Sequence, residues 1–272
     1  MTSRRPKLIL TNDDGIAAPG LFSLWRALAD HADVTIIAPA LDESGKGLSI
    51  TTLRPLHITQ VPWTDTGTNT TPAYQVDGTP VDCIKLALQI LVSDPPDMIV
   101  SGINRGSNAG RNVLYSGTVG GVIEGALRNI PGIAFSCDFD APQFARAEPF
   151  IFPLVHYLME HPLATGSLLN VTFPGQNGPI RGIRMAEQGQ SYWRGIPEKR
   201  VHPSGHSYYW LGGDQHDHDE HPESDVELLR QGYLTAVPLR VHQLTDREHL
   251  QNHKAHFEEW FAPFFLDRHP EQ

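Results

Sequence analysis

The sequence predicts an α/β protein with three layers, α/β/α, in which helices cover both faces of a Rossmann-like, mostly parallel sheet. Three observations support this fold class. The apolar run Leu8–Leu10 is unbroken, as in a strand covered on both faces. Strand-like and helix-like segments then alternate, and after Pro174 glycine, proline and histidine become frequent. We therefore expect a metal- and phosphate-binding core at 1–174. Residues 175–272 should form a β-hairpin and helix elaboration, packed on the same globule and used in oligomerisation.

The first forty residues contain a complete βαβ unit. After the strand Leu8–Leu10, apolar residues recur at helical spacing in Leu21–Ala29, and Val34–Ala38 is a second apolar strand that Pro39 ends. The alternation continues with a strand at Gln75–Asp77, a helix at Val81–Val92 preceded by Pro80, a strand at Asp97–Ser101, a helix that opens within Tyr115–Gly121, a strand at Ile133–Ser136, a helix at Glu148–Glu160 and a strand at Leu168–Phe173.

The C-terminal part has weaker signals. Tyr208–Leu211 is β-like, and Ser224 is a suitable N-cap for a helix at Ser224–Gly232. A strand at Tyr233–Val241 and a helix at Asp246–Phe261 are expected to follow.

Composition limits the possible partners. The 21 basic and 31 acidic residues give a formal charge of −10, the opposite sign to a general binder of nucleic-acid polymers. Two cysteines are too few for a disulfide scaffold and suit a reducing compartment. The N-terminus lacks the long apolar core of a secretory signal, and no segment has the length of a membrane span. We expect a cytoplasmic protein without membrane contact.

Two neighbouring carboxylates, Asp13 and Asp14, follow the first strand directly. Two like charges about 4 Å apart cost on the order of 4 kcal/mol at an effective dielectric of about 20. A shared proton, hydrogen bonds from loop amides or a divalent cation would offset that cost. An ordinary Asp-Gly turn is the simplest alternative, and this segment alone does not decide between them.

Three loops follow predicted strands, at Asn12–Gly15, Asp42–Gly47 and Ser101–Gly110, so they share one sheet edge. They offer oxygen ligands from Asp13, Asp14, Ser44 and Asn104, a set that suits Mg²⁺ or Mn²⁺ better than Zn²⁺. Glycines such as Gly45 let backbone amides approach an anion. Ser116, Gly117 and Thr118 precede a helix, where amides and hydroxyls can hold phosphate.

Other known patterns are missing. The chain has no GxxxxGK[ST] loop, and its two aspartates are adjacent rather than separated by one residue as in haloacid dehalogenases. The segment Asp214–His221 is rich in histidine and acids but has no apolar anchor, so we expect a solvated loop there rather than a metal site.

Five blocks of sequence resemble the SurE family of metal-dependent nucleotidases. They are TNDDGIAAPG, SGKGLSIT (Ser44–Thr51), DGTPVDC (Asp77–Cys83), PDMIVSGINRGSNAG (Pro96–Gly110) and YSGTVGGVIEG (Tyr115–Gly125). The resemblance continues more loosely to residue 239. Gly120-Gly121-Val122 replaces the usual Gly-Ala-Ala, and NVT at 170–172 replaces NVN. Neither departure touches a proposed ligand.

The resemblance implies a 5′-nucleotidase that also acts on 3′-nucleotides and uses one Mg²⁺ or Mn²⁺ per subunit. The implied metal ligands are Asp13, Asp14, Ser44 and Asn104, and Asp13 and Asp14 are also the catalytic residues. Residues facing the substrate would be Asn12, Gly45, Asn104, Ser116, Gly117 and Thr118. The resemblance further implies a homodimer or homotetramer that exchanges C-terminal elements.

We therefore expect hydrolysis of nucleoside monophosphates by a metal-activated water, with either aspartate as proton acceptor. A covalent aspartyl-phosphate is the competing route. Alternative functions are a short-chain polyphosphatase, a general phosphomonoesterase or a nucleotide sensor without activity.

Overall fold

The computed structural model describes residues 4–63, 71–137, 141–175 and 178–263. The chain forms two compact units, Met1–Arg240 and Val241–Gln272. The first unit contains the main sheet, and the second contains helix α6 (Arg247–Phe261), which begins after the N-cap Asp246. Within the described ranges, no helix combines the length and the apolar character needed to cross a membrane.

The main sheet, within the described part of the chain, has nine strands. Their order is β3 (Ile58–Gln60), β4 (Ala73–Val76), β2 (Asp33–Pro39), β1 (Lys7–Thr11), β5 (Met98–Arg105), β6 (Gly132–Cys137), β7 (Ser167–Phe173), β11 (Leu234–Arg240) and β8 (Ile183–Met185). The six strands from β4 to β7 run parallel, whereas β3 and β11 pair antiparallel with β4 and β7. The predicted Rossmann-like, mostly parallel sheet is confirmed.

Helices cover both faces of this sheet. On one face, Leu8 and Leu10 of β1 belong to the same buried cluster as α1 (Pro19–Leu28) and α4 (Glu148–Glu160). On the other face lie α2 (Pro80–Leu86) and α3 (Gly117–Ala126), and α3 packs against Ile99 of β5. Because side chains alternate between the faces of a strand, a continuous apolar run such as Leu8–Leu10 is needed to fill both layers.

Local chemistry sets where the helices begin. Proline occupies the first turn of α1, α2 and α4. Thr79 and Asp82 form a reciprocal capping box at the start of α2. Ser116 caps α3 and, as predicted, Ser224 caps α5 (Asp225–Arg230). Two short 3-10 helices, η2 (Gly110–Leu114) and η3 (Ala141–Arg146), precede α3 and α4.

Two predicted boundaries were wrong. The helix expected at Val81–Val92 is α-helical only to Leu86 and continues as a single π-helical segment, η1 (Ala87–Leu91). The strand expected to end at Ser101 continues to Arg105, with a register irregularity between Ser101 and Asn104. Pairing with β6 holds this extension in the sheet, because Asn104 lies opposite Ser136 and Arg105 opposite Cys137.

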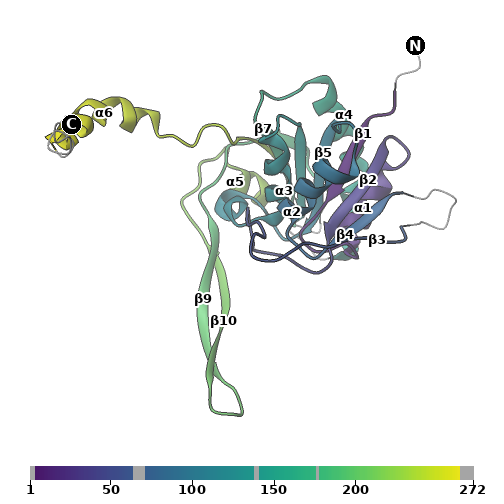
Figure 1. Cartoon of the computed structure of the whole chain (residues 1–272), viewed down its shortest axis with the longest axis horizontal. Helices are drawn as coiled ribbons and strands as arrows, with labels where there is room; N and C mark the ends of the chain where they lie inside the picture. Colours follow the sequence, from purple (N-terminus) through teal and green to yellow (C-terminus); the bar gives the residue numbers. More distant parts are fainter. Residues whose placement is uncertain (1–3, 64–70, 138–140, 176–177, 264–272) are drawn as a thin grey trace, which may run out of the picture. The chain divides into compact units, whose positions relative to one another are not determined.

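The β-like signal at Tyr208–Leu211 belongs to a long hairpin. Strand β9 (Tyr192–Val201) pairs antiparallel with β10 (Ser207–His216) over their full lengths, and Figure 1 shows them as a two-stranded ribbon. Several large apolar side chains of this ribbon are exposed, among them Trp193, Ile196, Tyr209, Trp210 and Leu211.

Gly20 tests how closely α1 packs on β5. A Cβ atom at this position would lie 2.0 Å from the backbone oxygen of Ile103. Gly20→Ala should therefore lower the free energy of unfolding by about 1–3 kcal/mol or more, because helix and strand must separate. Urea unfolding measures this, with Gly178→Ala as the control, since a Cβ there would meet nothing within 4 Å. Equal stabilities of the two variants would contradict the packing described.

Candidate active site at the carboxyl edge of the sheet

The chain turns sharply where β1 ends. Thr11 is the last residue of β1, and Asn12, Asp13 and Asp14 follow it. Gly15 has a φ of +98°, which is costly for any residue with a side chain, and this conformation lets the backbone leave the sheet edge. The side-chain Nδ2 of Asn12 donates to the Gly15 carbonyl at 3.0 Å and secures the turn. The paired aspartates are thereby held at the carboxyl edge.

Asp13 is almost completely buried, with 3% of its surface exposed. The Thr118 hydroxyl donates a hydrogen bond to Asp13 Oδ1, and the backbone N–H of Thr118 also contacts this carboxylate. A Cβ at Gly117 would lie 2.9 Å from Asp13 Cβ, so only glycine lets the start of α3 approach so closely. Burial raises the pKa of Asp13, and the hydrogen bonds from Thr118 partly offset this.

Asp14 is partly buried and accepts a hydrogen bond from the backbone N–H of Arg105 at 3.2 Å. Burial and, second to it, the neighbouring Asp13 charge raise the pKa of Asp14 to about 7. The pair therefore lies in a setting that disfavours two negative charges unless positive charge is added. An ordinary solvated turn would not produce that setting.

The extension of β5 positions Asn104 beside the pair. Its Nδ2 donates to the Gly106 carbonyl at 2.9 Å and to Asn108 Oδ1 at 3.3 Å. The amide orientation is thus set from the nitrogen side, which leaves Oδ1 as the atom that can face a ligand. Asn108 is itself buried, and its Nδ2 has no hydrogen-bond partner among the described residues.

A cavity of about 1330 Å³ opens at this edge. Its walls include five of the predicted site residues, namely Asp13, Ser44, Gly45, Asn104 and Ser116. Asn12, Asp14, Gly117 and Thr118 are not on its walls, and Asn12, Gly117 and Thr118 are buried behind them. The roles predicted for all nine residues stay predictions, but the structure brings them to one edge.

Two of the hydroxyl groups predicted to bind phosphate already form hydrogen bonds within the chain. The Ser116 hydroxyl accepts the backbone N–H of Val119 at 3.1 Å and caps α3. Thr118 is directed at Asp13 rather than at the cavity. Within the described residues, buried oxygens of Thr11, Asn12 and Ser101 have no hydrogen-bond partner. Such unpartnered polar atoms are costly, and they lie at the end of β1 and beside it within β5, where a cation or an ordered water would satisfy them.

The histidine-rich segment Asp214–His221 was predicted as a loop, but Asp214–His216 form the end of β10, because β9 pairs with them, and Gln215 and Asp217 lie on the cavity wall. In the part of the chain that the structure describes, no three His, Cys, Asp or Glu side chains form a group able to hold a metal ion. The Asp13, Asp14, Ser44 and Asn104 set is instead a carboxylate, hydroxyl and amide set, which suits a hard divalent cation.

Part of the cavity wall was not predicted from the sequence. Asn108 was visible in the GINRGSNAG block, four residues after Asn104, and its spacing could have suggested it. The remaining residues of the wall, which we call the distant wall, were not predicted as site residues from the sequence. They include Asn112, Tyr115, Trp193, Leu211, Val226, Leu229 and Arg230.

Two acids, the buried Asp225 and the partly exposed Glu220, join this distant wall to the site. Asp225 accepts backbone N–H groups of Gly110 at 3.0 Å and Gly189 at 2.8 Å, and burial raises its pKa. Glu220 accepts the backbone N–H and the hydroxyl of Ser191, at 2.7 and 2.6 Å. The loop after β5 and the segment that leads into β9 are therefore held by carboxylates from a third segment.

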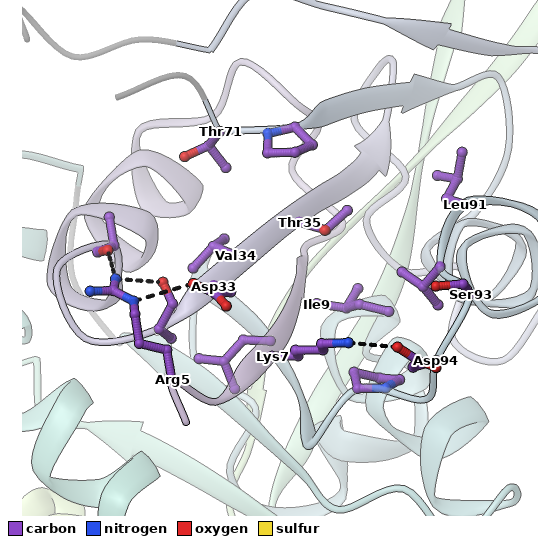
Figure 2. A pocket seen from close by; sticks show the side chains of 16 residues that line it. Arg5, Lys7, Ile9, Asp33, Val34, Thr35, Thr71, Leu91, Ser93 and Asp94 are labelled. Atoms are coloured by element: carbon purple, nitrogen blue, oxygen red, sulfur yellow. Dashed lines mark hydrogen bonds and ion pairs between the residues drawn. The ribbon is translucent and has the colours of Figure 1, made fainter. Parts of the chain in front are cut away.

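A second cavity, of about 590 Å³, lies at the opposite edge of the sheet, where β1 and β2 begin. Figure 2 shows its two cations already paired, Arg5 with Asp33 at 3.2 Å and Lys7 with Asp94 at 2.7 Å. These exposed pairs neutralise the positive charge that would attract an anion. The amino edge therefore has the features of a structural surface, unlike the carboxyl edge.

Comparisons with known proteins find relatives that cover most of this chain. The family model described as "Survival protein SurE" matches residues 8–195. The 5′-nucleotidase SurE of Protochlamydia amoebophila is 47% identical over 259 residues, covering 94% of this chain and 98% of that protein. The corresponding protein of Natranaerobius thermophilus is 36% identical over 246 residues. The crystal structure of the SurE protein from Aquifex aeolicus superposes with a TM-score of 0.75 at 30% identity, covering 93% of this chain and all of that one.

Asp225→Asn tests the carboxylate that holds the distant wall. The variant keeps the size of the side chain but loses one acceptor for the backbone N–H groups, which should lower the free energy of unfolding by about 1–3 kcal/mol. Asp219→Asn, at an exposed position in the same segment, should change it by less than about 0.5 kcal/mol. Urea unfolding measures both. A stable Asp225→Asn variant would show that this carboxylate does not hold the wall.

Proposed function

The chain belongs to the SurE family, and from this we propose that it is a 5′-nucleotidase that hydrolyses nucleoside 5′-monophosphates to nucleoside and phosphate. One observation of the structure carries most weight. Asp13, the oriented Asn104 amide, Ser44, Gly45 and Ser116 line one cavity at the carboxyl edge of a parallel sheet, and Asp14 follows Asp13 directly. This edge is where ligands bind in folds of this class.

The donor set fits a divalent cation. Burial raises the pKa of Asp13, and burial together with the Asp13 charge raises the pKa of Asp14, so a positive charge beside them would be favourable. The nitrogen of the Asn104 amide is occupied, so its oxygen is left for coordination. We propose that Asp13, Asp14, Ser44 and Asn104 hold one Mg²⁺ or Mn²⁺. When bound there, it would neutralise phosphate charge and make a bound water more acidic.

The chain's own residues would position the phosphate. Ser44, Gly45 and Ser116 all lie on the cavity wall, where hydroxyl groups and the backbone amide of Gly45 would face the equatorial oxygens. Thr118 orients Asp13 through its hydroxyl, and the Arg105 backbone orients Asp14. In this proposal Asn12 and Gly117 support the same turn and helix end, and either aspartate receives the proton from water.

Several finer features also remain proposals. Action on 3′-nucleotides follows from the resemblance described above. A homodimer or homotetramer with exchanged C-terminal elements is supported by α6, whose exposed side chains include Leu250, Phe257 and Trp260. A cytoplasmic location is supported by the small number of cysteines and by Cys83, which is a free, buried thiol.

Phosphate release tests the proposal directly. Nucleoside 5′- and 3′-monophosphates are supplied with Mn²⁺, Mg²⁺ or EDTA. The native chain should release phosphate only with a metal. Asp13→Asn should reduce the rate more than about 100-fold, because several kcal/mol of charge stabilisation are lost. Asp94→Asn, which changes a carboxylate at the opposite edge, should retain the native rate.

Other outcomes would point to different functions. Release from polyphosphate but not from nucleotides would keep the metal site and change the substrate. Nucleotide binding without any turnover would indicate a sensor. A phosphoryl group trapped on Asp13 or Asp14 would replace direct attack by water with a covalent route.

Thr118 tests the positioning of Asp13. Thr118→Val keeps the shape of the side chain but removes the hydroxyl donor, so the buried carboxylate is less well oriented. We expect the Mn²⁺ concentration for half-maximal activity to rise about 10-fold or more, as for other residues that orient metal ligands. Thr118→Ser keeps the donor and should retain near-native metal dependence. If serine and valine behave alike, the hydroxyl does not position Asp13.

A further inference from the structure

The cavity at the carboxyl edge is larger than a phosphate group requires, and its wall combines two kinds of side chain. Asp13, Ser44 and Asn104 are polar, and we call their part of the wall the polar end. Tyr115, Trp193, Leu211, Val226 and Leu229 are aromatic or apolar, and we call their part the apolar end. A single ligand that fills both ends must carry an anionic group at one side and a flat or apolar group at the other.

The apolar end combines a packed floor with uncovered aromatic side chains. Val226 and Leu229 are both 8% exposed and form a small buried cluster with Ala109. Above them, Tyr115 is 56% and Trp193 51% exposed. A single exposed aromatic residue is common on protein surfaces, but two that line one cavity over an apolar floor leave a face that a ligand can cover.

Backbone contacts hold the aromatic wall in place. The N–H of Trp193 donates to Asn112 Oδ1 at 2.6 Å, and the N–H of Arg111 donates to the Ser191 carbonyl at 2.9 Å. A Cβ at Gly110 would lie only 2.3 Å from that same carbonyl, so the start of β9 is tightly packed on η2. The backbone of Trp193 is therefore held in place before any ligand binds, which reduces the entropy lost on binding.

We propose that Trp193 and Tyr115, with the apolar floor, form the subsite for the nucleobase of the substrate. This inference rests on the proposed nucleotidase function and adds the recognition of the base. Every base has a π face, so recognition by stacking accepts purines and pyrimidines alike. The charged groups at this end, Arg230 and Asp217, pair with one another. Stacking is thus the main determinant, and it predicts a broad rather than a strict base preference.

The test compares AMP with ribose 5-phosphate, which has the same phosphate ester but no base. The measured quantity is the ratio of kcat/KM for AMP to kcat/KM for ribose 5-phosphate. Trp193→Ala should lower this ratio about 10-fold to 100-fold, as expected for loss of one stacking partner. Trp193→Phe should recover most of the ratio. Trp210→Ala is the matched control, because Trp210 is exposed on β10 but is not on the cavity wall, and it should keep the native ratio.

A second measurement separates this subsite from the catalytic proposal. The fluorescence of 2-aminopurine riboside 5′-monophosphate is followed as the native chain and the three variants are added. Quenching that requires an aromatic residue at 193 supports the subsite even if no nucleotide is hydrolysed, in which case only the nucleotidase proposal fails. An unchanged kinetic ratio in Trp193→Ala, or equal quenching by Trp193→Ala and the native chain, would overturn the subsite.

Discussion

Burial of two adjacent carboxylates at the end of β1 is the constraint on which the rest of the site depends. Asp13 and Asp14 repel one another in a setting that burial makes unfavourable for charge, so their neighbours must compensate. Thr118 brings the start of α3 to Asp13, and the Arg105 backbone brings the extended end of β5 to Asp14. The same requirement explains Gly117, because a side chain there would push α3 away from Asp13.

The far side of the cavity depends on a second pair of acids, the buried Asp225 and the partly exposed Glu220. They accept backbone N–H groups from segments that are separated by many residues in the chain, and so they join the loop after β5 to the start of the hairpin. The loops of the parallel sheet thus supply the polar residues of the cavity and Tyr115, whereas the segments after β7 supply Trp193 and the apolar floor. In the proposed enzyme, the polar residues would carry out the reaction, and the aromatic and apolar residues would bind the base.

Most of the fold could be predicted from sequence because its signals are local. Apolar runs such as Leu8–Leu10 indicated the central strands, and Ser224 indicated the start of α5, as the structure confirms. Two predicted strands were too short, because pairing with a neighbouring strand decides where each one ends. β5 extends to Arg105 because β6 continues beside it, and the strand predicted at Tyr208–Leu211 is ten residues long because β9 pairs with all of it.

For the candidate site, the sequence by itself determined the chemistry that is available. It contained the adjacent Asp13 and Asp14, the amide of Asn104 and the glycines at each turn, and parallel strands necessarily present such residues at one edge. Only the tertiary structure decided how they are used. It directed Thr118 at Asp13 rather than at the cavity, and it placed Trp193 on the same wall as Tyr115. These outcomes depend on burial and on contacts between distant segments, and no local pattern of residues encodes either.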